Sequence, residues 1–226
     1  MLLYGGAGRR FGGEKGLALF EGRPLVERLL AMLDSISDDV MISTNAPEAY
    51  RSCGHRLVPD LRPGWGPLAG IQSGLQAARY DWMAVVAGDM PFASAELLRL
   101  LAERAAACAP DRAAVRPAER AETCAVIVPL HTRARGREPD RPTDAPGAGA
   151  PGAAHPQPEP LHALYHRRCL TAIEAVLRAG GRRIVEIYPL VGVCEVAEGT
   201  WRAAGINDRV FANINTPEDL RRLSSE

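Results

Sequence analysis

The sequence predicts an α/β protein with a mostly parallel sheet, and three observations support this fold class. Short apolar runs alternate along the chain with segments whose apolar residues recur at helical spacing. Polar or glycine-rich stretches follow several of the apolar runs, as they do where parallel strands end at a ligand-binding edge. The chain has 226 residues, a usual length for one α/β domain, so we expect a single domain over residues 1–226.

The expected strands and helices alternate in chain order. Strands are predicted at residues 1–4, 40–44, 56–60, 82–87, 123–130, 160–165, 191–196 and 211–215, and helices at 24–33, 68–79, 94–108, 168–178, 182–188 and after Thr216. Pro24 suits a first helical position, and Ser94 and Thr216 are good N-caps. The first strand is shorter than the about five or six residues common for strands, so we expect either a natural start upstream or a thinner core edge.

The charge balance excludes some classes of protein. The 27 Lys and Arg residues match the 27 Asp and Glu residues, so the formal net charge is zero. A general binder of nucleic acid or of membrane surfaces would carry a basic excess. No apolar run approaches the roughly 18 residues of a membrane span, and no signal-peptide pattern opens the chain. We therefore expect a cytoplasmic protein.

The cysteines and histidines give weaker signals. The cysteines lack C-x-x-C spacing, so we expect reduced and mostly buried thiols rather than a zinc knuckle or a disulfide framework. His162 and His166 stand four residues apart near Cys169, a spacing that also suits metal ligands. The break between a predicted strand and helix falls among them, so we expect ordinary surface histidines. The five cysteines are Cys53, Cys108, Cys124, Cys169 and Cys194.

Residues 132–160 differ in composition from the rest of the chain. They are nearly all Pro, Gly, Ala, Arg, Asp and Glu, with no apolar side chain larger than alanine or proline. Such a segment cannot bury enough surface to offset the entropy of ordering it. The composition predicts a disordered insertion at about 132–160, and a lid or a docking segment for a partner enzyme is the alternative.

The glycine-rich segment after the first strand suits a phosphate chain. Glycines let backbone N–H groups converge on an anion, and Arg10 and Lys15 supply cationic charge. Phe11 stands where the third glycine of G-x-G-x-x-G belongs, and Gly16 stands where a Walker A loop needs a hydroxyl. Both common nucleotide motifs therefore fail, and the segment predicts a triphosphate cradle of another kind or, as the alternative, a flexible turn.

Polar side chains end the second and third predicted strands. Asn45 is placed to hydrogen-bond a base or a ribose, or alternatively to cap the short helix after Pro47. The carboxylate of Asp60 can accept two adjacent hydrogen bonds, which matches the N1–H and 2-amino edge of guanine. A helix-capping or arginine-paired surface carboxylate is the alternative for Asp60.

The fourth predicted strand delivers Gly-Asp-Met-Pro at residues 88–91. A carboxylate fixed at a strand end suits Mg²⁺, which often binds through one or two carboxylates and takes its other ligands from phosphates and water. Asp89 is therefore the candidate metal ligand and catalytic residue. Its alternative role, as N-cap of the next helix, is better filled by Ser94.

Several motifs together resemble one family. The pattern Leu-x-Gly-Gly-x-x-x-Arg-x-Gly-x-x-Lys resembles the signature loop of the molybdenum cofactor guanylyltransferases, the MobA family of nucleotidyltransferases. Gly-Pro-Leu-Ala-Gly at 66–70, Gly-Asp-x-Pro at 88–91, Pro-Leu-x-Ala-Leu-Tyr at 160–165 and Asn-x-Asn-Thr-Pro-Glu at 213–218 occur in the family's order. The resemblance spans residues 1–92 and 160–223. Tyr4 departs from the small alanine usual in the family and is expected to crowd the nucleotide site.

The resemblance implies a Rossmann-like three-layer α/β/α nucleotidyltransferase fold. It implies transfer of GMP from GTP to the terminal phosphate of molybdopterin or Mo-molybdopterin, with release of pyrophosphate and with Mg²⁺, or alternatively Mn²⁺, as the cofactor. It also implies molybdenum insertion proteins and molybdoenzymes as partners. Arg10, Lys15 and Asp89 are expected to be catalytic, and Asn213 and Asn215, on one face of the chain, to lie near substrate or metal. The expected nucleotide-binding residues are Leu3, Tyr4, Gly5, Gly6, Gly12, Lys15, Asn45, Asp60, Gly70 and Asp89.

Two alternatives remain at the level of sequence. One is a related nucleotidyltransferase that uses another nucleotide or acceptor, such as a molybdopterin cytidylyltransferase or a sugar-phosphate enzyme. The other is a relative that binds nucleotide or cofactor without catalysis. Lys15, Asp89 and Asn215 argue against the second, because a carrier needs no metal carboxylate.

Overall fold

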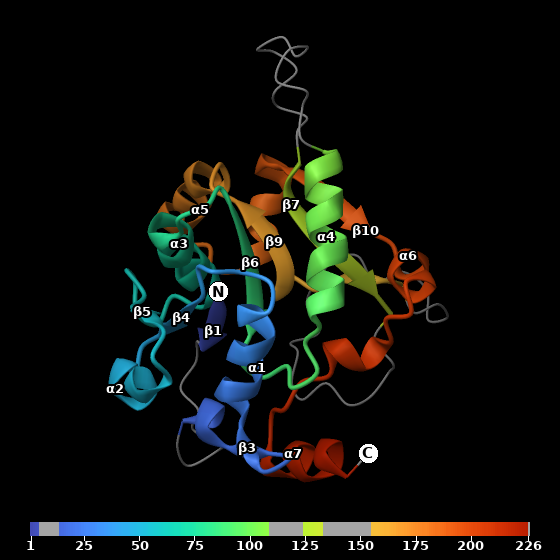
Figure 1. Ribbon diagram of the computed structural model, residues 1–226. Helices are drawn as coiled ribbons and strands as arrows, with labels where there is room; N and C mark the ends of the chain where they lie inside the picture. Colours follow the sequence, from blue (N-terminus) through green and yellow to red (C-terminus); the bar gives the residue numbers. More distant parts are fainter. Residues whose placement is uncertain (5–13, 109–123, 133–154, 226) are drawn as a thin grey trace, which may run out of the picture.

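A mixed, mostly parallel sheet forms the centre of the computed structural model, which describes residues 1–4, 14–108, 124–132 and 155–225 (Figure 1). The path across the sheet runs β10 (Gly192–Val196), β7 (Cys124–His131), β9 (His162–His166), β6 (Trp82–Ala87), β1 (Leu2–Tyr4), β4 (Met41–Thr44) and β5 (Arg56–Val58). Of these, β9 is antiparallel to both its neighbours, and the other pairs are parallel. Outside this path, β8 (Gln157–Pro158) pairs with β7, and β2 (Leu19–Phe20) pairs with β3 (Arg23–Pro24).

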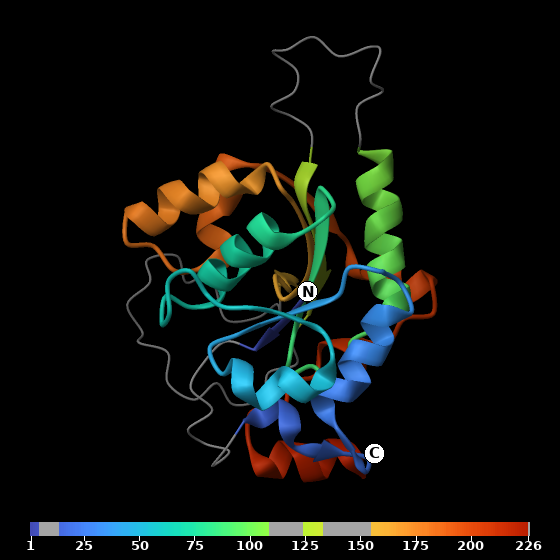
Figure 2. The ribbon, with the colours of Figure 1, turned by 60° about the vertical axis from the view of Figure 1, so that its left-hand side comes forward.

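Helices cover both faces of the sheet, which confirms the three-layer prediction. Figure 2 shows α3 and α5 on one side of the sheet and α1 and α4 on the other. Successive strand residues point to opposite faces, so Leu2 and Val86 pack on the α1 and α4 side, and Leu3 and Val85 on the α3 and α5 side. Burial on both faces explains the continuous apolar runs of the central strands. The α-helices are α1 (Leu25–Asp34), α2 (Pro47–Tyr50), α3 (Pro67–Ala77), α4 (Ala95–Ala107), α5 (Cys169–Arg178), α6 (Glu198–Ala203) and α7 (Pro217–Ser224).

Predicted helix starts are confirmed where a side chain supplies the cap. The Oγ of Ser94 accepts a hydrogen bond from the backbone N of Leu97 at 3.1 Å. Thr216 and Asp219 form a reciprocal capping box at the start of α7. No helix within the described residues is long and apolar enough to cross a membrane.

The structure corrects three of the expected elements. The helix expected at 182–188 is a 3-10 helix, Ile184–Leu190. The strand expected at 211–215 is absent from the described sheet, because the backbone N of Ile214 bonds to the carbonyl of Asp89 at 2.8 Å instead of joining a ladder. Residues 155–160 were expected to end a disordered segment, yet they include β8 and the buried Glu159. Most of that insertion, residues 133–154, lies outside the described part of the chain.

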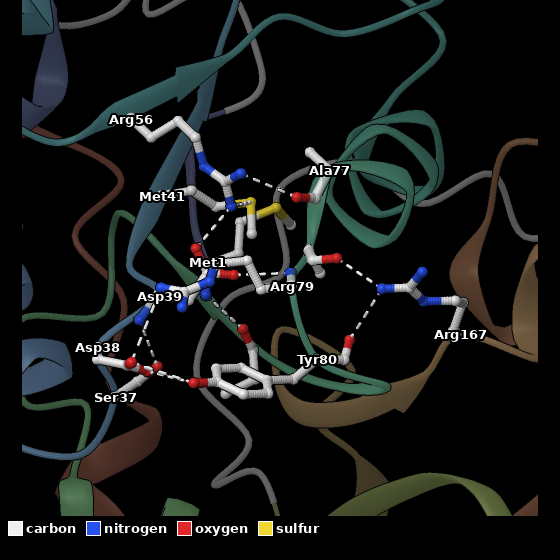
Figure 3. A network of polar contacts seen from close by, with 12 residues as sticks. Met1, Ser37, Asp38, Asp39, Met41, Arg56, Ala77, Arg79, Tyr80 and Arg167 are labelled. Carbon is white, nitrogen blue, oxygen red and sulfur yellow. Dashed lines mark hydrogen bonds and ion pairs between the residues drawn. The ribbon is translucent and has the colours of Figure 1, made fainter.

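A polar network joins the elements at the amino ends of β4, β5 and β6 (Figure 3). The carboxylate of Asp39 accepts hydrogen bonds from Arg56 Nη2 at 2.7 Å and from the backbone N of Arg79 at 2.9 Å. The hydroxyl of Tyr80 donates to Asp38 at 2.9 Å. This network braces the edge of the sheet opposite the carboxyl ends of the strands.

Candidate functional site

The carboxyl ends of β1, β4 and β6 meet at one edge of the sheet. In the parallel register, Tyr4 lies opposite Thr44, and Leu3 lies opposite Ala87. The polar residues that follow these strands therefore start from neighbouring positions. This convergence is the geometry by which open α/β sheets bind ligands.

Lys15 and Asp89 form an ion pair at this edge. Lys15 opens a 3-10 helix (Lys15–Leu17), and Asp89 follows β6. Lys15 Nζ lies 3.2 Å from Asp89 Oδ2, and the two side chains are 20% and 31% exposed. Both remain accessible to a ligand, so the pair can exchange its mutual contact for a phosphate on the lysine and a cation on the aspartate.

Asn45 and Asp60 form a hydrogen bond where the neighbouring strands β4 and β5 end. The carboxylate of Asp60 accepts from Ser43 Oγ at 3.1 Å and from Asn45 Nδ2 at 2.9 Å. The alternative of Asn45 as a helix cap is wrong, because Ala46 is the N-cap of α2 and no side chain caps it. The structure thus joins two predicted nucleotide-binding residues into one polar unit.

Gly70 and Leu3 serve the packing behind the site. A Cβ on Gly70 would lie 2.5 Å from Leu3 Cδ1 and 3.3 Å from Asp60 Oδ1. The glycine therefore lets α3 approach β1 closely, directly below Asp60. Leu3 is only 5% exposed, so its side chain belongs to the core.

The ring of Tyr4 packs against Gly16 and Gly88, which are the chain neighbours of Lys15 and Asp89. The same ring stacks on Tyr50 with centroids 4.9 Å apart. A Cβ on Gly16 would come within 2.6 Å of this ring, and one on Gly88 within 2.1 Å. Burial raises the pKa of Tyr4 well above its usual value. The two glycines that neighbour Lys15 and Asp89 thus make the room that the tyrosine ring needs.

The segment with the two predicted asparagines lies against Asp89. The hydrogen bond from Ile214 N to the carbonyl of Asp89 fixes this approach, and Ile214 is fully buried. Asn213 is half-buried and Asn215 is exposed. The backbone N of Asn215 donates to Asp219 Oδ2 at 3.0 Å, which ties the segment to the start of α7.

A buried histidine cluster beside the site was missed by sequence reasoning. His162 is fully buried, which corrects the expectation of a surface residue, and it pairs with Val86 near the end of β6. Burial lowers the pKa of His162 to about 4. His131 stacks on Phe211 with centroids 4.3 Å apart, and its Nε2 lies 3.5 Å from Glu159 Oε2. The sequence does contain a signal for this burial, because His162 directly follows Leu161 within a predicted apolar strand.

The metal alternative for His162, His166 and Cys169 finds no support. Within the described part of the chain these three do not gather at ligand distances from one another. The thiol of Cys169 instead donates to the carbonyl of Ala125 at 3.2 Å. Of the predicted site residues, Gly5, Gly6, Arg10 and Gly12 lie outside the described residues.

The fold and this edge of the sheet define the class as a Rossmann-like nucleotidyltransferase. Residues 1–192 match the family model of the MobA-like NTP transferase domain. The chain belongs to this family.

Curated relatives align along nearly the whole chain. The probable molybdenum cofactor guanylyltransferase of Pelotomaculum thermopropionicum is 34% identical over 220 residues, which cover 97% of this chain and 88% of the relative. The molybdenum cofactor guanylyltransferase of Pseudomonas aeruginosa is 33% identical over 223 residues, which cover 97% of this chain and 91% of the relative.

Solved structures share the fold. Molybdopterin-guanine dinucleotide biosynthesis protein A from Archaeoglobus fulgidus has a TM-score of 0.69 at 25% identity and covers 99% of this chain and 95% of its own. The 2-C-methyl-D-erythritol 4-phosphate cytidylyltransferase of Thermus thermophilus has a TM-score of 0.68 at 18% identity. The match covers 100% of this chain and 96% of the solved chain. At that identity the second match concerns the fold alone.

Proposed function

We propose that this protein transfers GMP from GTP to the terminal phosphate of molybdopterin, free or loaded with molybdenum. The products are pyrophosphate and the guanine dinucleotide form of the cofactor. The observation that carries the proposal is the accessible Lys15–Asp89 pair at the ligand-binding edge, in a chain whose relatives bear the guanylyltransferase name. The named activity of those relatives supports the choice of GTP and molybdopterin.

The transfer needs positioning and charge neutralisation more than covalent chemistry. The acceptor phosphate is already an anionic nucleophile, so it can attack the α-phosphorus of GTP in line without an enzyme-bound intermediate. Lys15 leaves its 3.2 Å contact with Asp89 and binds phosphoryl oxygens of the triphosphate. Arg10, which lies outside the described residues, would add a second cation.

The donor set at this edge suits a divalent cation such as Mg²⁺, with Mn²⁺ as the alternative. Asp89 offers a partly exposed carboxylate, and the asparagine segment beside it offers amide oxygens, which are the hard ligands that Mg²⁺ prefers. When bound, the cation would neutralise charge on the phosphates. Asp89 would hold it, and Asn213 or Asn215 would contact the cation or the substrate.

Asp60 is placed to recognise the base. Each of its carboxylate oxygens accepts one hydrogen bond from Ser43 or Asn45, and each retains capacity for a second. The two oxygens can then accept from N1–H and the 2-amino group of guanine. Cytosine and adenine do not present that pair of donors.

Pyrophosphate release from each of the four nucleoside triphosphates tests the proposal. The reactions contain Mg²⁺ and either include or omit molybdopterin. We expect release with GTP that depends on molybdopterin, and a reduced preference for GTP in Asp60→Asn. Asp34→Asn, a surface carboxylate paired with His55, is the matched control.

Other outcomes would redirect the assignment. Preferred turnover of CTP would identify a related transferase with another nucleotide. Tight binding of GTP without pyrophosphate release, in the presence of Mg²⁺ and molybdopterin, would identify a non-catalytic carrier.

A further inference from the structure

Three cysteines that are far apart in the sequence come together on the α4 side of the sheet. They are Cys108, which caps the C-terminal end of α4, Cys124, the first residue of β7, and Cys194 in β10. Their Sγ atoms all lie within 4.8 Å of one another, and the three side chains are half-buried. The sequence prediction of mostly buried thiols is wrong, because Cys169 alone of the five cysteines is buried, and the spacing of the cysteines in the sequence did not indicate this cluster.

This thiol cluster is separate from the nucleotide edge. Both β6 and β7 run antiparallel to β9, so β6 and β7 point the same way. Asp89 follows the carboxyl end of β6, whereas Cys124 stands at the amino end of β7. The cluster therefore lies toward the opposite edge of the sheet and takes no part in the proposed transfer.

The spacing of the sulfur atoms suits a shared cation. A zinc–sulfur bond of about 2.3 Å in tetrahedral geometry puts neighbouring sulfurs about 3.8 Å apart. From a separation of at most 4.8 Å, the thiols reach that arrangement through shifts of about 1 Å or less. A disulfide would instead use two of the sulfurs at about 2.05 Å and leave the third without a role.

The surrounding charge fits the same conclusion. Three thiolates around a divalent cation would carry one net negative charge, and the guanidinium of Arg104, one helical turn before Cys108 and near Cys194, would offset part of that charge.

We propose that Cys108, Cys124 and Cys194 form a thiolate site for Zn²⁺, with water in the fourth position. Zinc takes thiolate ligands, whereas Mg²⁺ takes oxygen ligands, so this site and the Asp89 site select different cations. Bound zinc would tie the end of α4 to β7 and β10. It would thereby stabilise the outer half of the sheet.

The test uses the whole chain, metal-free and kept reduced without oxygen. Co²⁺ is titrated as a spectroscopic probe and is then displaced by Zn²⁺. We expect one Co²⁺ per chain with a thiolate-to-cobalt charge-transfer band, and affinity at least about 10²-fold weaker in Cys124→Ser. Zn²⁺ in about 100-fold excess over its Kd should raise the Tm by roughly 5–10 °C.

Controls separate this site from other thiols and from the nucleotide edge. Cys53→Ser removes a half-buried thiol outside the cluster and should bind Co²⁺ as the parent does. Excess Mg²⁺ should not displace the probe. If Cys124→Ser does not fold by circular dichroism, Cys194→Ser provides the same comparison.

Two results would overturn the proposal. One is the absence of a charge-transfer band in the reduced parent protein, or a band of equal strength in Cys124→Ser and Cys194→Ser. The other is a protein that binds no Co²⁺ when reduced and whose measured mass falls by that of two hydrogen atoms when a mild oxidant is added. That outcome would assign the cluster to a disulfide.

Discussion

Protonation of His162 should make the stability of the fold depend on pH. The side chain is fully buried at the start of β9, with Glu159 and His131 as the titratable neighbours on the adjoining segments. Burial lowers its pKa from 6.5 to about 4, so the unfolded chain binds the proton more readily than the folded chain. The stability that the neutral ring contributes is therefore complete above pH 6.5 and is lost as the pH falls toward 4.

The magnitude follows from the two pKa values. At pH 5, protonation of His162 favours the unfolded state in the unfolding equilibrium by a factor of about 30 and favours the folded state hardly at all. This factor corresponds to about 2 kcal/mol of lost stability. For a chain of this size, about 2 kcal/mol lowers the Tm by roughly 4–8 °C. Thermal unfolding followed by circular dichroism at pH 7.5 and pH 5 measures this difference.

A comparison of variants isolates His162 from the other groups that titrate. His162→Leu and His162→Gln should lose less stability between pH 7.5 and pH 5 than the parent does, by about 2 kcal/mol. His155→Gln changes an exposed histidine and should retain the parent's pH dependence. The same decrease in Tm in the parent and in both His162 variants would refute the reasoning.

Three further predictions concern the site, the polar network at the amino ends of the strands, and the core. Lys15→Ala and Asp89→Ala should each lower turnover by at least ~10²-fold, whereas near-normal rates in either folded variant would remove its assigned role. Asp39→Ala should cost about 1–3 kcal/mol in urea unfolding, because it removes the hydrogen bonds that this 8% exposed carboxylate accepts from Arg56 and from the backbone N of Arg79, and an unchanged midpoint would contradict this. Gly88→Ala should destabilise the protein by about 1–3 kcal/mol, since its Cβ would meet the Tyr4 ring at 2.1 Å, and the cost should shrink when Tyr4 is also alanine.

The sequence predicted the central strands and helices well because their signals are local. Apolar runs such as Trp82–Ala87 appeared as the strand β6, and the caps at Ser94 and Thr216 appeared with their expected hydrogen bonds. The placement of Asn45, Asp60 and Asp89 at one edge also followed, because parallel strands end together. Their direct contacts, such as the Asn45–Asp60 bond, depend on side-chain positions that the strand pattern does not encode.

Contacts between distant segments could not be predicted in the same way. Cys108, Cys124 and Cys194 meet only because β7 and β10 pair in parallel beside the end of α4. The segment around Ile214 looked like a strand because its residues alternate between apolar and polar. Its actual place is decided by one hydrogen bond to the carbonyl of Asp89, a partner more than 120 residues earlier in the chain.

The antiparallel strand β9 explains why His162 escaped prediction. The rule that ligands bind at the carboxyl ends of strands holds for parallel strands, and it directs attention to residues that follow a strand. Because β9 runs against β6, its first residue lies beside Val86, near the end of β6. A residue that begins a strand thus reaches the ligand-binding edge, as His162 does next to the Asp89 turn. For an antiparallel strand inside a mostly parallel sheet, the residues at the amino end of the strand are therefore the candidates for the site.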